Sequence, residues 1–363
     1  MERHVELLLS GLGRDITVDN IVSNEKFRNE IHVSDGFKVY KIASIGRLAG
    51  VGITPAMPFW ARSLCRKIEY DIVHLHFPDP LSHFSVDFVP KSVKLVISWH
   101  SDIIRQKNWL KLYQPFLDNI VRRADAIIAA TPRHFSSSTQ LSASQYRGKL
   151  HVIPYGIDLD RFALTHDISD AASRIRKQHT GKKLVFSVGR HVYYKGYEYL
   201  LQAMKEVDAL LLLGGTGPLH EDLKLLAGKL KLDGKVVFLG RVSDSELPAY
   251  YHASELYCMP SVERSEAFGI VQIEAMGCKK PVVCCELNNG VTYVNRHGVT
   301  GLVVPPREPV ALAAALNELM DDDKKRITMG EAGYARAHEE FTIERMCRDT
   351  LRLYRQVLNG KVY

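Results

Sequence analysis

The chain has 363 residues, of which 46% are hydrophobic and 25% are charged. This length suits two domains that each bury a core, and the composition excludes an intrinsically disordered protein. The formal net charge is +7, and residues 1–150 carry most of it, because their 20 basic and 14 acidic side chains leave +6. This excess fits an anionic partner, such as a phospholipid surface or a diphosphate-linked acceptor, or plain solubilising charge.

The cysteines and the hydropathy pattern indicate the compartment. The six cysteines show no Cys-x-x-Cys pair and no metal-ligand spacing with histidine; they are Cys65, Cys258, Cys278, Cys284, Cys285 and Cys347. Three of them lie in or beside apolar runs, as buried free thiols do. We therefore expect a cytoplasmic protein. The sequence shows no signal peptide and no run of about eighteen apolar residues, so any membrane contact is expected to be peripheral.

The start of the chain departs from the order of a doubly wound domain. Residues 1–12 predict an amphipathic helix that ends near Gly13, and residues 16–22 predict a strand. A doubly wound domain opens instead with a strand and a glycine-rich turn before its first helix. We expect that the start was assigned too late or that the chain is shortened, and a shortened chain would put activity in doubt.

From residue 71 onward, strands and helices alternate. Apolar, β-branched runs predict four strands, at residues 71–76, 94–100, 126–130 and 150–153. Helices fit between them at residues 109–124 and 133–143. This alternation predicts a parallel sheet covered on both faces, with ligands at the carboxyl ends of the strands. His100 stands at such an end, and His74 and His76 face one side of the sheet as further candidates.

Residues 103–123 combine basic and aromatic side chains. The basic ones are Arg105, Lys107, Lys111, Arg122 and Arg123, and the large apolar ones are Trp109, Leu110, Tyr113 and Phe116. Such a helix can lie on an anionic membrane with its aromatic rings at the interface. It can equally be an ordinary surface helix whose apolar stripe faces the sheet.

Residues 154–162 interrupt the alternation, and we place the domain boundary there because Gly156 permits a tight turn. Apolar runs then predict a second set of strands, at residues 184–188, 209–213, 236–242, 256–258 and 281–285. Helices are predicted at residues 309–319 and 324–358. The turn after the first strand holds Arg190 and Lys195 between glycines, where two cations would neutralise a diphosphate.

The stretch 259–277 carries two carboxylates at one end of a predicted helix. The helix is expected at residues 268–276, with Glu266 in the turn before it and Glu274 two turns inside. The first free backbone N–H groups, near Phe268 and Gly269, can bind a diphosphate. Each carboxylate can accept two hydroxyl hydrogen bonds, which suits a sugar nucleotide. The alternative is that Glu266 complements the helix dipole and Glu274 is a solvated surface residue.

The run Glu266-Ala267-Phe268-Gly269, followed by Glu274-Ala275-Met276, resembles the signature of the retaining glycosyltransferases of family 4, and the resemblance covers nearly the whole chain from residue 2. It implies the GT-B fold, with two Rossmann-like, doubly wound α/β domains that face a cleft, here apparently without the first strand of the N-terminal domain. The domains would comprise residues 1–158 and 159–340, and a C-terminal helix at about 341–363 would pack back onto the first domain.

The resemblance also implies residue roles. Glu266 would contact the donor sugar hydroxyls and Glu274 the ribose, while His100 would reach the donor sugar. Arg190 and Lys195 would hold the diphosphate, so that the implied catalytic set is His100, Arg190, Lys195 and Glu266. Further donor-binding positions are expected at Gly189, Gly215, Gly217, Arg241, Phe268, Gly269, Ile270 and Val271.

The expected function is transfer of a hexose from a UDP- or GDP-sugar to a glycan hydroxyl with retention of configuration. The acceptor is expected to be linked to a polyprenyl diphosphate at the inner membrane, in cell-surface polysaccharide or lipopolysaccharide biosynthesis. No Asp-x-Asp motif lies in a suitable loop, so we expect no metal, and also no cofactor and no nucleic-acid partner. Two alternatives are a non-catalytic nucleotide-sugar or membrane-binding partner and a GT-B-shaped nucleotide-sugar epimerase.

Overall fold

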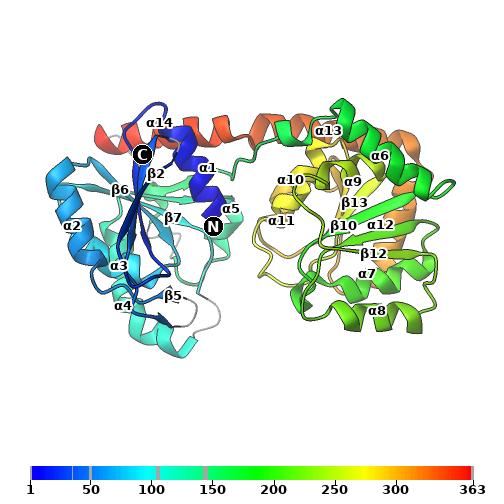
Figure 1. The fold of residues 1–363 in the computed structure, drawn as a ribbon, viewed down its shortest axis with the longest axis horizontal. Coiled ribbons are helices and arrows are strands. Elements are labelled where there is room, and N and C mark those ends of the chain that lie inside the picture. The colour runs from blue at the N-terminus through cyan, green and yellow to red at the C-terminus, as the bar shows by residue number, and fades with distance from the viewer. Residues whose placement is uncertain (1, 35, 49–50, 104–106, 142–145, 361–363) are drawn as a thin grey trace. The chain divides into compact units, whose positions relative to one another are not determined.

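The computed structural model describes residues 2–34, 36–48, 51–103, 107–141 and 146–360. The chain divides into two compact units (Figure 1). The N-terminal unit comprises residues 1–156 and 343–363, and the C-terminal unit comprises residues 157–342. Each unit contains a parallel sheet with helices packed against it, which confirms the predicted α/β class with two Rossmann-like units.

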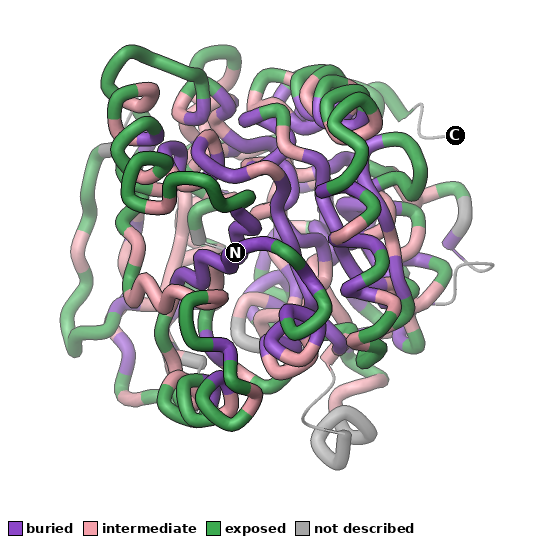
Figure 2. Tube along the Cα trace, turned by 90° about the vertical axis from the view of Figure 1, so that its right-hand side faces the viewer, coloured by how far each residue is buried: buried purple, intermediate pink, exposed green. Residues whose placement is uncertain are grey.

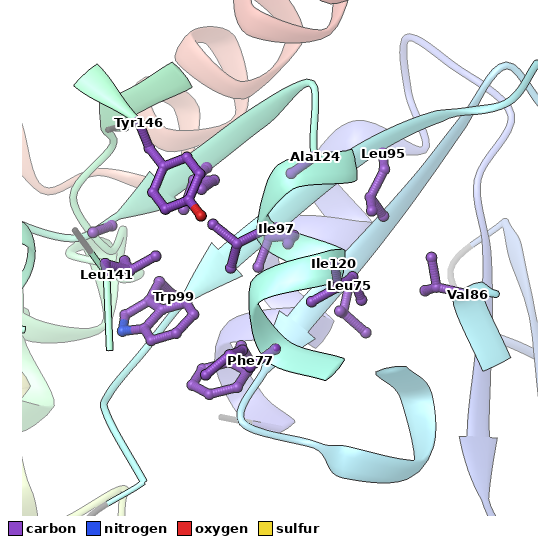
Figure 3. Packing of buried hydrophobic residues seen from close by; sticks show 14 of the residues in the cluster. Leu75, Phe77, Val86, Leu95, Ile97, Trp99, Ile120, Ala124, Leu141 and Tyr146 are labelled. Carbon is purple, nitrogen blue, oxygen red and sulfur yellow. The ribbon is translucent and has the colours of Figure 1, made fainter. Parts of the chain in front are cut away.

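The main sheet of the N-terminal unit has four parallel strands in the order β6-β7-β8-β9. These strands are β6 (Ile72–Phe77), β7 (Lys94–Trp99), β8 (Ala126–Ala129) and β9 (Leu150–Val152). The rings of Phe77 and Trp99 stack with centroids 3.9 Å apart, in a core that Leu117 and Ile120 of α4 (Lys107–Arg123) complete (Figure 3). β7 and β8 are almost wholly buried and apolar, as strands covered on both faces are, whereas β6 carries His74 and His76.

A second, three-stranded sheet in this unit was not predicted. It has the order β1-β3-β2, with β1 at Asp19–Ser23, β2 at Glu30–Ser34 and β3 at Phe37–Ile42. The strand predicted at residues 16–22 begins only at Asp19. The backbone N–H groups of Asp15 and Ile16 still donate to the carbonyl of Leu12, so they extend the turn that ends α1 (Glu2–Leu12).

The helix predicted at residues 133–143 is wrong beyond its first turn, because α5 spans only Pro132–Ser136. The hydroxyl of Ser138 accepts the backbone N–H groups of Gln140 and Leu141 at 3.2 and 3.0 Å, and the N–H of Thr139 donates to Asp102 at 2.8 Å. These side-chain acceptors replace the carbonyls that a continuing helix would use. Residues 142 and 143 of the prediction lie outside the described residues.

The sheet of the C-terminal unit has six parallel strands in the order β12-β11-β10-β13-β14-β15. The strands are β10 (Leu184–Val188), β11 (Leu210–Gly214), β12 (Val236–Gly240), β13 (Leu256–Met259), β14 (Val282–Cys285) and β15 (Gly301–Val304). All five strands that the sequence predicts in this unit, between residues 184 and 285, appear within two residues of their expected bounds. Strands β11, β13 and β14 are buried along their whole length. Buried segments of the chain are purple in Figure 2.

The helical stretch predicted at residues 324–358 is two helices, α13 (Asp323–Glu340) and α14 (Ile343–Leu358), and α14 corresponds to the C-terminal helix expected at about 341–363. Phe341 is fully buried between them, and its carbonyl accepts the N–H of Ile157 at 2.9 Å, so the chain cannot continue as a helix there. α14 packs on α1 within the N-terminal unit (Figure 1). A Cβ on Gly11 would lie 2.3 Å from Sγ of Cys347, so the glycine allows this close approach.

The remaining elements are short connectors or covering helices. In the N-terminal unit they are β4 (Arg47–Leu48), β5 (Val51–Gly52), α2 (Met57–Ile68) and α3 (Pro80–Val86). In the C-terminal unit they are α6 (His166–Gln178), α7 (Tyr197–Ala203), α8 (His220–Lys229), α9 (Leu247–Ala253), α10 (Ile270–Gly277), α11 (Val291–Val294) and α12 (Pro309–Asp321). All six cysteines are free and buried, and burial raises the pKa of each thiol. Among the described residues, no helix combines the length and apolar content that a membrane crossing requires.

Candidate functional site

The strand order of the C-terminal unit locates a ligand site. The chain leaves the central strand β10 for β11 and β12 on one side, and then returns to place β13 on the other side of β10. In open α/β sheets, ligands bind outside the carboxyl ends of the strands at such a switch point. The loops that follow β10 and β13 are therefore the candidate site, and they contain Lys195 and Glu266.

These two loops touch at an ion pair. Nζ of Lys195 donates a hydrogen bond to Oε2 of Glu266, and the hydroxyl of Ser261 donates to the same oxygen at 3.2 Å. Both charged side chains are only 13% exposed. Gly196 has φ of 66°, and a Cβ there would lie 2.2 Å from the carbonyl oxygen of Pro260. Only glycine permits both this conformation and this approach.

A third loop supports the backbone around Glu266. Nδ2 of Asn289 donates to the carbonyl of Glu266 at 2.5 Å, and the N–H of Gly290 donates to the carbonyl of Ala267 at 3.0 Å. Asn289 follows β14, so three neighbouring strand ends meet at this carboxylate. The sequence did not indicate that Asn289 holds the backbone of Glu266.

The helix after Glu266 begins two residues later than predicted. Gly269 has φ of 77° and precedes the first turn of α10, so the first free N–H groups of the helix belong to Ile270 and Val271. The predicted donors at Phe268 and Gly269 lie before the helix, and Phe268 is buried against Phe341. Ile270 is exposed, so this N-terminus is open to solvent.

Glu274 lies one turn inside α10 and has a partner that the sequence did not indicate. Oε2 of Glu274 is 3.0 Å from the hydroxyl of Tyr251 on α9, and the same hydroxyl lies 3.2 Å from the carbonyl oxygen of Val271. Burial, together with the nearby Glu274 carboxylate, raises the pKa of Tyr251 well above its usual value. The phenol is therefore protonated and orients the carboxylate.

The glycines after β10 and β11 pack backbone against backbone. A Cβ on Gly215 would lie 1.9 Å from the carbonyl oxygen of Gly189, and a Cβ on Gly217 would lie 2.5 Å from that of His191. Gly215 has φ of 115°, and its N–H donates to the carbonyl of Gly240 at 2.6 Å. Arg190 and Arg241, which follow β10 and β12, are both exposed.

His100 lies in the N-terminal unit, in a cluster of histidines at the ends of β6 and β7. Its Nδ1 is 2.6 Å from the hydroxyl of Tyr155, and its Nε2 is 3.0 Å from Nδ1 of His76. Both ring nitrogens are thus engaged, and a donor hydroxyl could reach His100 only if one of these contacts opened. The rings of His74 and His76 stack at 4.6 Å, which confirms that they share one face of the sheet.

His4, on α1, completes this cluster and was not predicted from the sequence. Its ring centroid lies 5.3 Å from that of His100 and 4.6 Å from that of Tyr155. Burial lowers the pKa of His4 to about 4 and also lowers those of His76 and His100, so the three imidazoles are neutral near pH 7. Nothing in the pattern of residues 1–12 distinguishes His4 from other polar positions of an amphipathic helix.

The structure thus brings the predicted residues together in two groups. Arg190, Lys195, Glu266 and Glu274, with the glycines, lie in the C-terminal unit around the switch point, and His100 lies in the N-terminal unit. The basic and aromatic cluster predicted at residues 103–123 lies partly outside the described residues, at 104–106 and in the side chains of 107–112.

Comparison with known proteins shows the family. The family model described as Glycosyltransferase Family 4 matches residues 1–161, and the one described as Glycosyl transferases group 1 matches residues 169–336. The D-rhamnosyltransferase WbpZ of Pseudomonas aeruginosa is 39% identical over 279 residues, which cover 76% of this chain and 70% of that protein. The chain is a family 4 glycosyltransferase.

A second relative of this glycosyltransferase is the O-antigen chain mannosyltransferase C of Escherichia coli, which is 32% identical over 84% of this chain and 81% of its own length. Among solved structures, a glycosyltransferase from Rickettsia africae superposes with a TM-score of 0.77 at 18% identity, and the match covers 98% of this chain and 95% of that one. Anabaena HepE in complex with UDP and glucose gives a TM-score of 0.71 at 20% identity, covering 97% and 95%. These matches confirm the GT-B fold.

Proposed function

We propose that the glycosyltransferase moves a hexose from a nucleoside diphosphate sugar to a hydroxyl group of a lipid-linked glycan, with retention of configuration, during assembly of a cell-surface polysaccharide. The observation that carries the proposal is the ion pair of Lys195 and Glu266 at the switch point. It sets a cation and a carboxylate beside the free N-terminus of α10. Relatives named for transfer of D-rhamnose and mannose support a hexose donor.

Different groups of the C-terminal unit would bind the three parts of the donor, which are the diphosphate, the transferred sugar and the ribose. The diphosphate would meet Arg190, Lys195 and the N–H groups of Ile270 and Val271, where the helix dipole favours an anion. Glu266 would accept hydroxyl groups of the transferred sugar, and Glu274 those of the ribose. UDP is bound in the related HepE structure, and a mannosyltransferase of Mycolicibacterium smegmatis that is 30% identical over 254 residues is named as GDP-mannose-dependent, so both UDP and GDP are candidate carriers.

In the proposed reaction, the bond between the anomeric carbon and the diphosphate oxygen breaks, and a bond from the acceptor oxygen to the same carbon forms on the same face. The acceptor proton passes to the departing phosphate oxygen, so no separate general base is assigned. Arg190 and Lys195 would stabilise the negative charge that grows on the leaving group, and no metal ion is assigned to the diphosphate.

The test is a donor screen followed by product analysis. Purified protein is melted in the presence of UDP, GDP and their common sugar conjugates, because a ligand that binds only the folded state raises the melting temperature by mass action. The donor that stabilises most is then incubated with and without a polyprenyl-diphosphate-linked glycan. Acceptor-dependent release of the nucleotide and a product with retained configuration are expected. Conversion of the donor into a different nucleotide sugar without acceptor indicates the epimerase alternative, and no binding of any donor contradicts the proposal.

The membrane part of the proposal rests on exposed phenylalanines of the N-terminal unit. Phe59 on α2 is 65% exposed and Phe116 on α4 is 52% exposed. Phe59 contacts the ring of Phe88 and Phe116 contacts that of Phe84, with centroids 5.7 and 5.5 Å apart. We call these four residues the phenylalanine row. Phe84 lies on α3 and Phe88 lies two residues after its end, so α3 and the turn that follows it supply one ring of each pair.

Basic side chains accompany the phenylalanine row. Arg62, Arg66 and Lys67 on α2 and Lys91 after α3 are exposed, and so are the two acidic residues Glu69, at the end of α2, and Asp87. Exposed aromatic rings with surrounding positive charge are the chemistry that binds an anionic phospholipid surface, and each basic residue near it contributes about 1 kcal/mol. We therefore assign an anionic membrane as the partner of this surface.

Vesicle co-sedimentation tests this assignment. Wild type is expected to bind vesicles that contain anionic lipid at low salt and to be released at high salt. The double variant Phe84→Ser/Phe116→Ser should bind at least tenfold more weakly, while Val310→Ser, which removes an 80% exposed apolar side chain of the C-terminal unit, should bind like wild type. Equal binding by all three proteins would exclude the phenylalanine row as the membrane contact.

A further inference from the structure

The strand β2 forms the outer edge of the three-stranded sheet in the N-terminal unit (Figure 1). In the described part of the chain it pairs only with β3, and the register between the two strands runs unbroken over all five residues of β2. The free N–H and C=O groups of an edge strand can pair with a further strand, and proteins often prevent this with a proline or a bulge. β2 contains neither, so the sheet can be extended at this edge.

The hydrogen bonds of β3 show which backbone groups of β2 point outward. The N–H of Lys38 donates to Oδ1 of Asp19 at 3.0 Å, on the side of β1. Val33 stands opposite Lys38, so the backbone groups of these two residues point away from each other. This pattern alternates along an antiparallel ladder. The N–H and C=O groups of both Val33 and Ile31 therefore face the free edge.

The side chains along this edge differ between the two faces of the strand. Ile31 is 57% exposed and Val33 is 74% exposed, and residues two apart in a strand lie on the same face. They form an apolar strip along the edge. Glu30 and His32 lie on the other face, where Oε2 of Glu30 and Nε2 of His32 are 3.3 Å apart. A partner strand therefore has to offer apolar side chains on one face and polar side chains on the other.

We propose that β2 pairs with β2 of a second copy of this chain, antiparallel and centred on Ile31, so that two three-stranded sheets join into one six-stranded sheet. In this register Ile31 stands opposite its own counterpart, and Val33 of each copy stands opposite Asn29 of the other. The two apolar strips then adjoin across the two-fold axis. Glu30 of each copy stands opposite His32 of the other, so that a hydrogen-bond acceptor faces a donor twice.

The strand is complementary to itself, which is the reason to assign a second copy as its partner. A register centred on His32 would set the two imidazoles opposite each other and would leave each Glu30 opposite Ser34. The charges therefore favour the register centred on Ile31. Because both copies use the same edge, the contact closes on itself and stops at two copies. The inference does not depend on the donor site, since all these residues belong to the N-terminal unit.

Sedimentation velocity of the full chain, over a concentration series, measures this assembly. We expect a reversible dimer with a Kd of about 1–100 µM, because the pairing of two short strands buries less area than a standard interface. Ile31→Lys places two like charges directly opposite each other and should weaken the dimer by at least tenfold. Ile45→Lys is the matched control, since Ile45 is a 63% exposed isoleucine of the same unit outside β2, and this variant should dimerise like wild type.

Cross-linking of introduced cysteines tests the register, and the six native cysteines are all buried. In Ile31→Cys the two new residues stand opposite each other with Cα atoms about 5.5 Å apart, which a disulfide can span. In Val33→Cys they are displaced by four residues, or about 13 Å. Under mild oxidation with diamide, Ile31→Cys should form a covalent dimer and Val33→Cys should not. A chain that stays monomeric at every concentration, a dimer that Ile31→Lys leaves unchanged, or equal cross-linking of both cysteine variants would overturn the proposal.

Discussion

A double-mutant cycle can separate what the ion pair of Lys195 and Glu266 contributes to stability from what it contributes to turnover. Each side chain is 13% exposed, so Lys195→Met leaves a largely buried carboxylate without its counter-charge. Breaking a buried pair costs 3–5 kcal/mol, and the partial exposure places this one near the lower end, at about 3 kcal/mol. In a unit of this size, 1 kcal/mol shifts the melting temperature by about 2–4 °C, so a fall of about 6–12 °C is expected.

The double variant Lys195→Met/Glu266→Gln should regain part of this loss, because neither charge is then left alone. Residues in contact show coupling of about 0.5–3 kcal/mol. Turnover should behave differently. Each single variant should lose about two to three orders of magnitude, since a preorganised charge near the diphosphate or a hydroxyl acceptor near the sugar is missing, and the double variant should regain none of it.

Thermal melts and acceptor-dependent nucleotide release measure the two quantities. Lys224→Met is the control, because Lys224 pairs with Glu221 on the surface of α8, where the side chains are 45% and 77% exposed, and such pairs contribute about 0–1 kcal/mol. Strictly additive melting shifts in the cycle would refute the structural coupling. Turnover that recovers together with stability in the double variant would show that the single variants lost activity by unfolding.

Three further predictions follow from other contacts. Glu274→Gln should weaken calorimetric binding of the free nucleotide by at least tenfold with little change in melting temperature, whereas equal loss in Glu266→Gln would contradict separate roles. Gly215→Ala should destabilise the C-terminal unit by more than 2 kcal/mol in urea unfolding, because its Cβ would lie 1.9 Å from the carbonyl oxygen of Gly189. Burial lowers the pKa of Lys280 to about 8, so the unfolded chain binds the extra proton between pH 8 and the usual value of 10.5. Unfolding free energy should therefore rise across that range by up to about 3 kcal/mol relative to Lys280→Met, and parallel pH profiles would exclude this shift.

The sequence predicted best where an element is buried on both faces. The runs that became β10, β11, β13 and β14 are short and almost wholly apolar, and a parallel strand covered by helices needs that pattern. The three-stranded sheet of residues 19–42 lacks it. β2 holds Glu30 and His32 and exposes Ile31 and Val33, so its composition does not differ from that of a loop.

Helix boundaries failed where a side chain or a tertiary contact replaced the helical hydrogen bond. Ser138 and Asp102 capture the N–H groups that would have continued α5, and Asp102 is 37 residues from Thr139 in sequence. Phe341 ends α13 because its ring is fully buried and its carbonyl bonds to Ile157. Asp102 and Ile157 both lie outside a window of helical length around the helix ends that they affect, so local propensity gave the wrong bounds.

The site residues Lys195 and Glu266 could be predicted from the sequence, but the residues that support the site could not. Lys195 and Glu266 could be singled out because each follows an apolar strand, and strand ends of a parallel sheet lie at one edge. That they touch depends on the order β11-β10-β13, which makes their strands neighbours although 71 residues separate them. Tyr251 and Asn289 come from a helix and from a loop after another strand, so only the folded sheet brings them to Glu274 and Glu266. The sequence motifs did not indicate the order of the strands in the sheet. That order decides which strand ends are neighbours, and therefore which site residues come into contact.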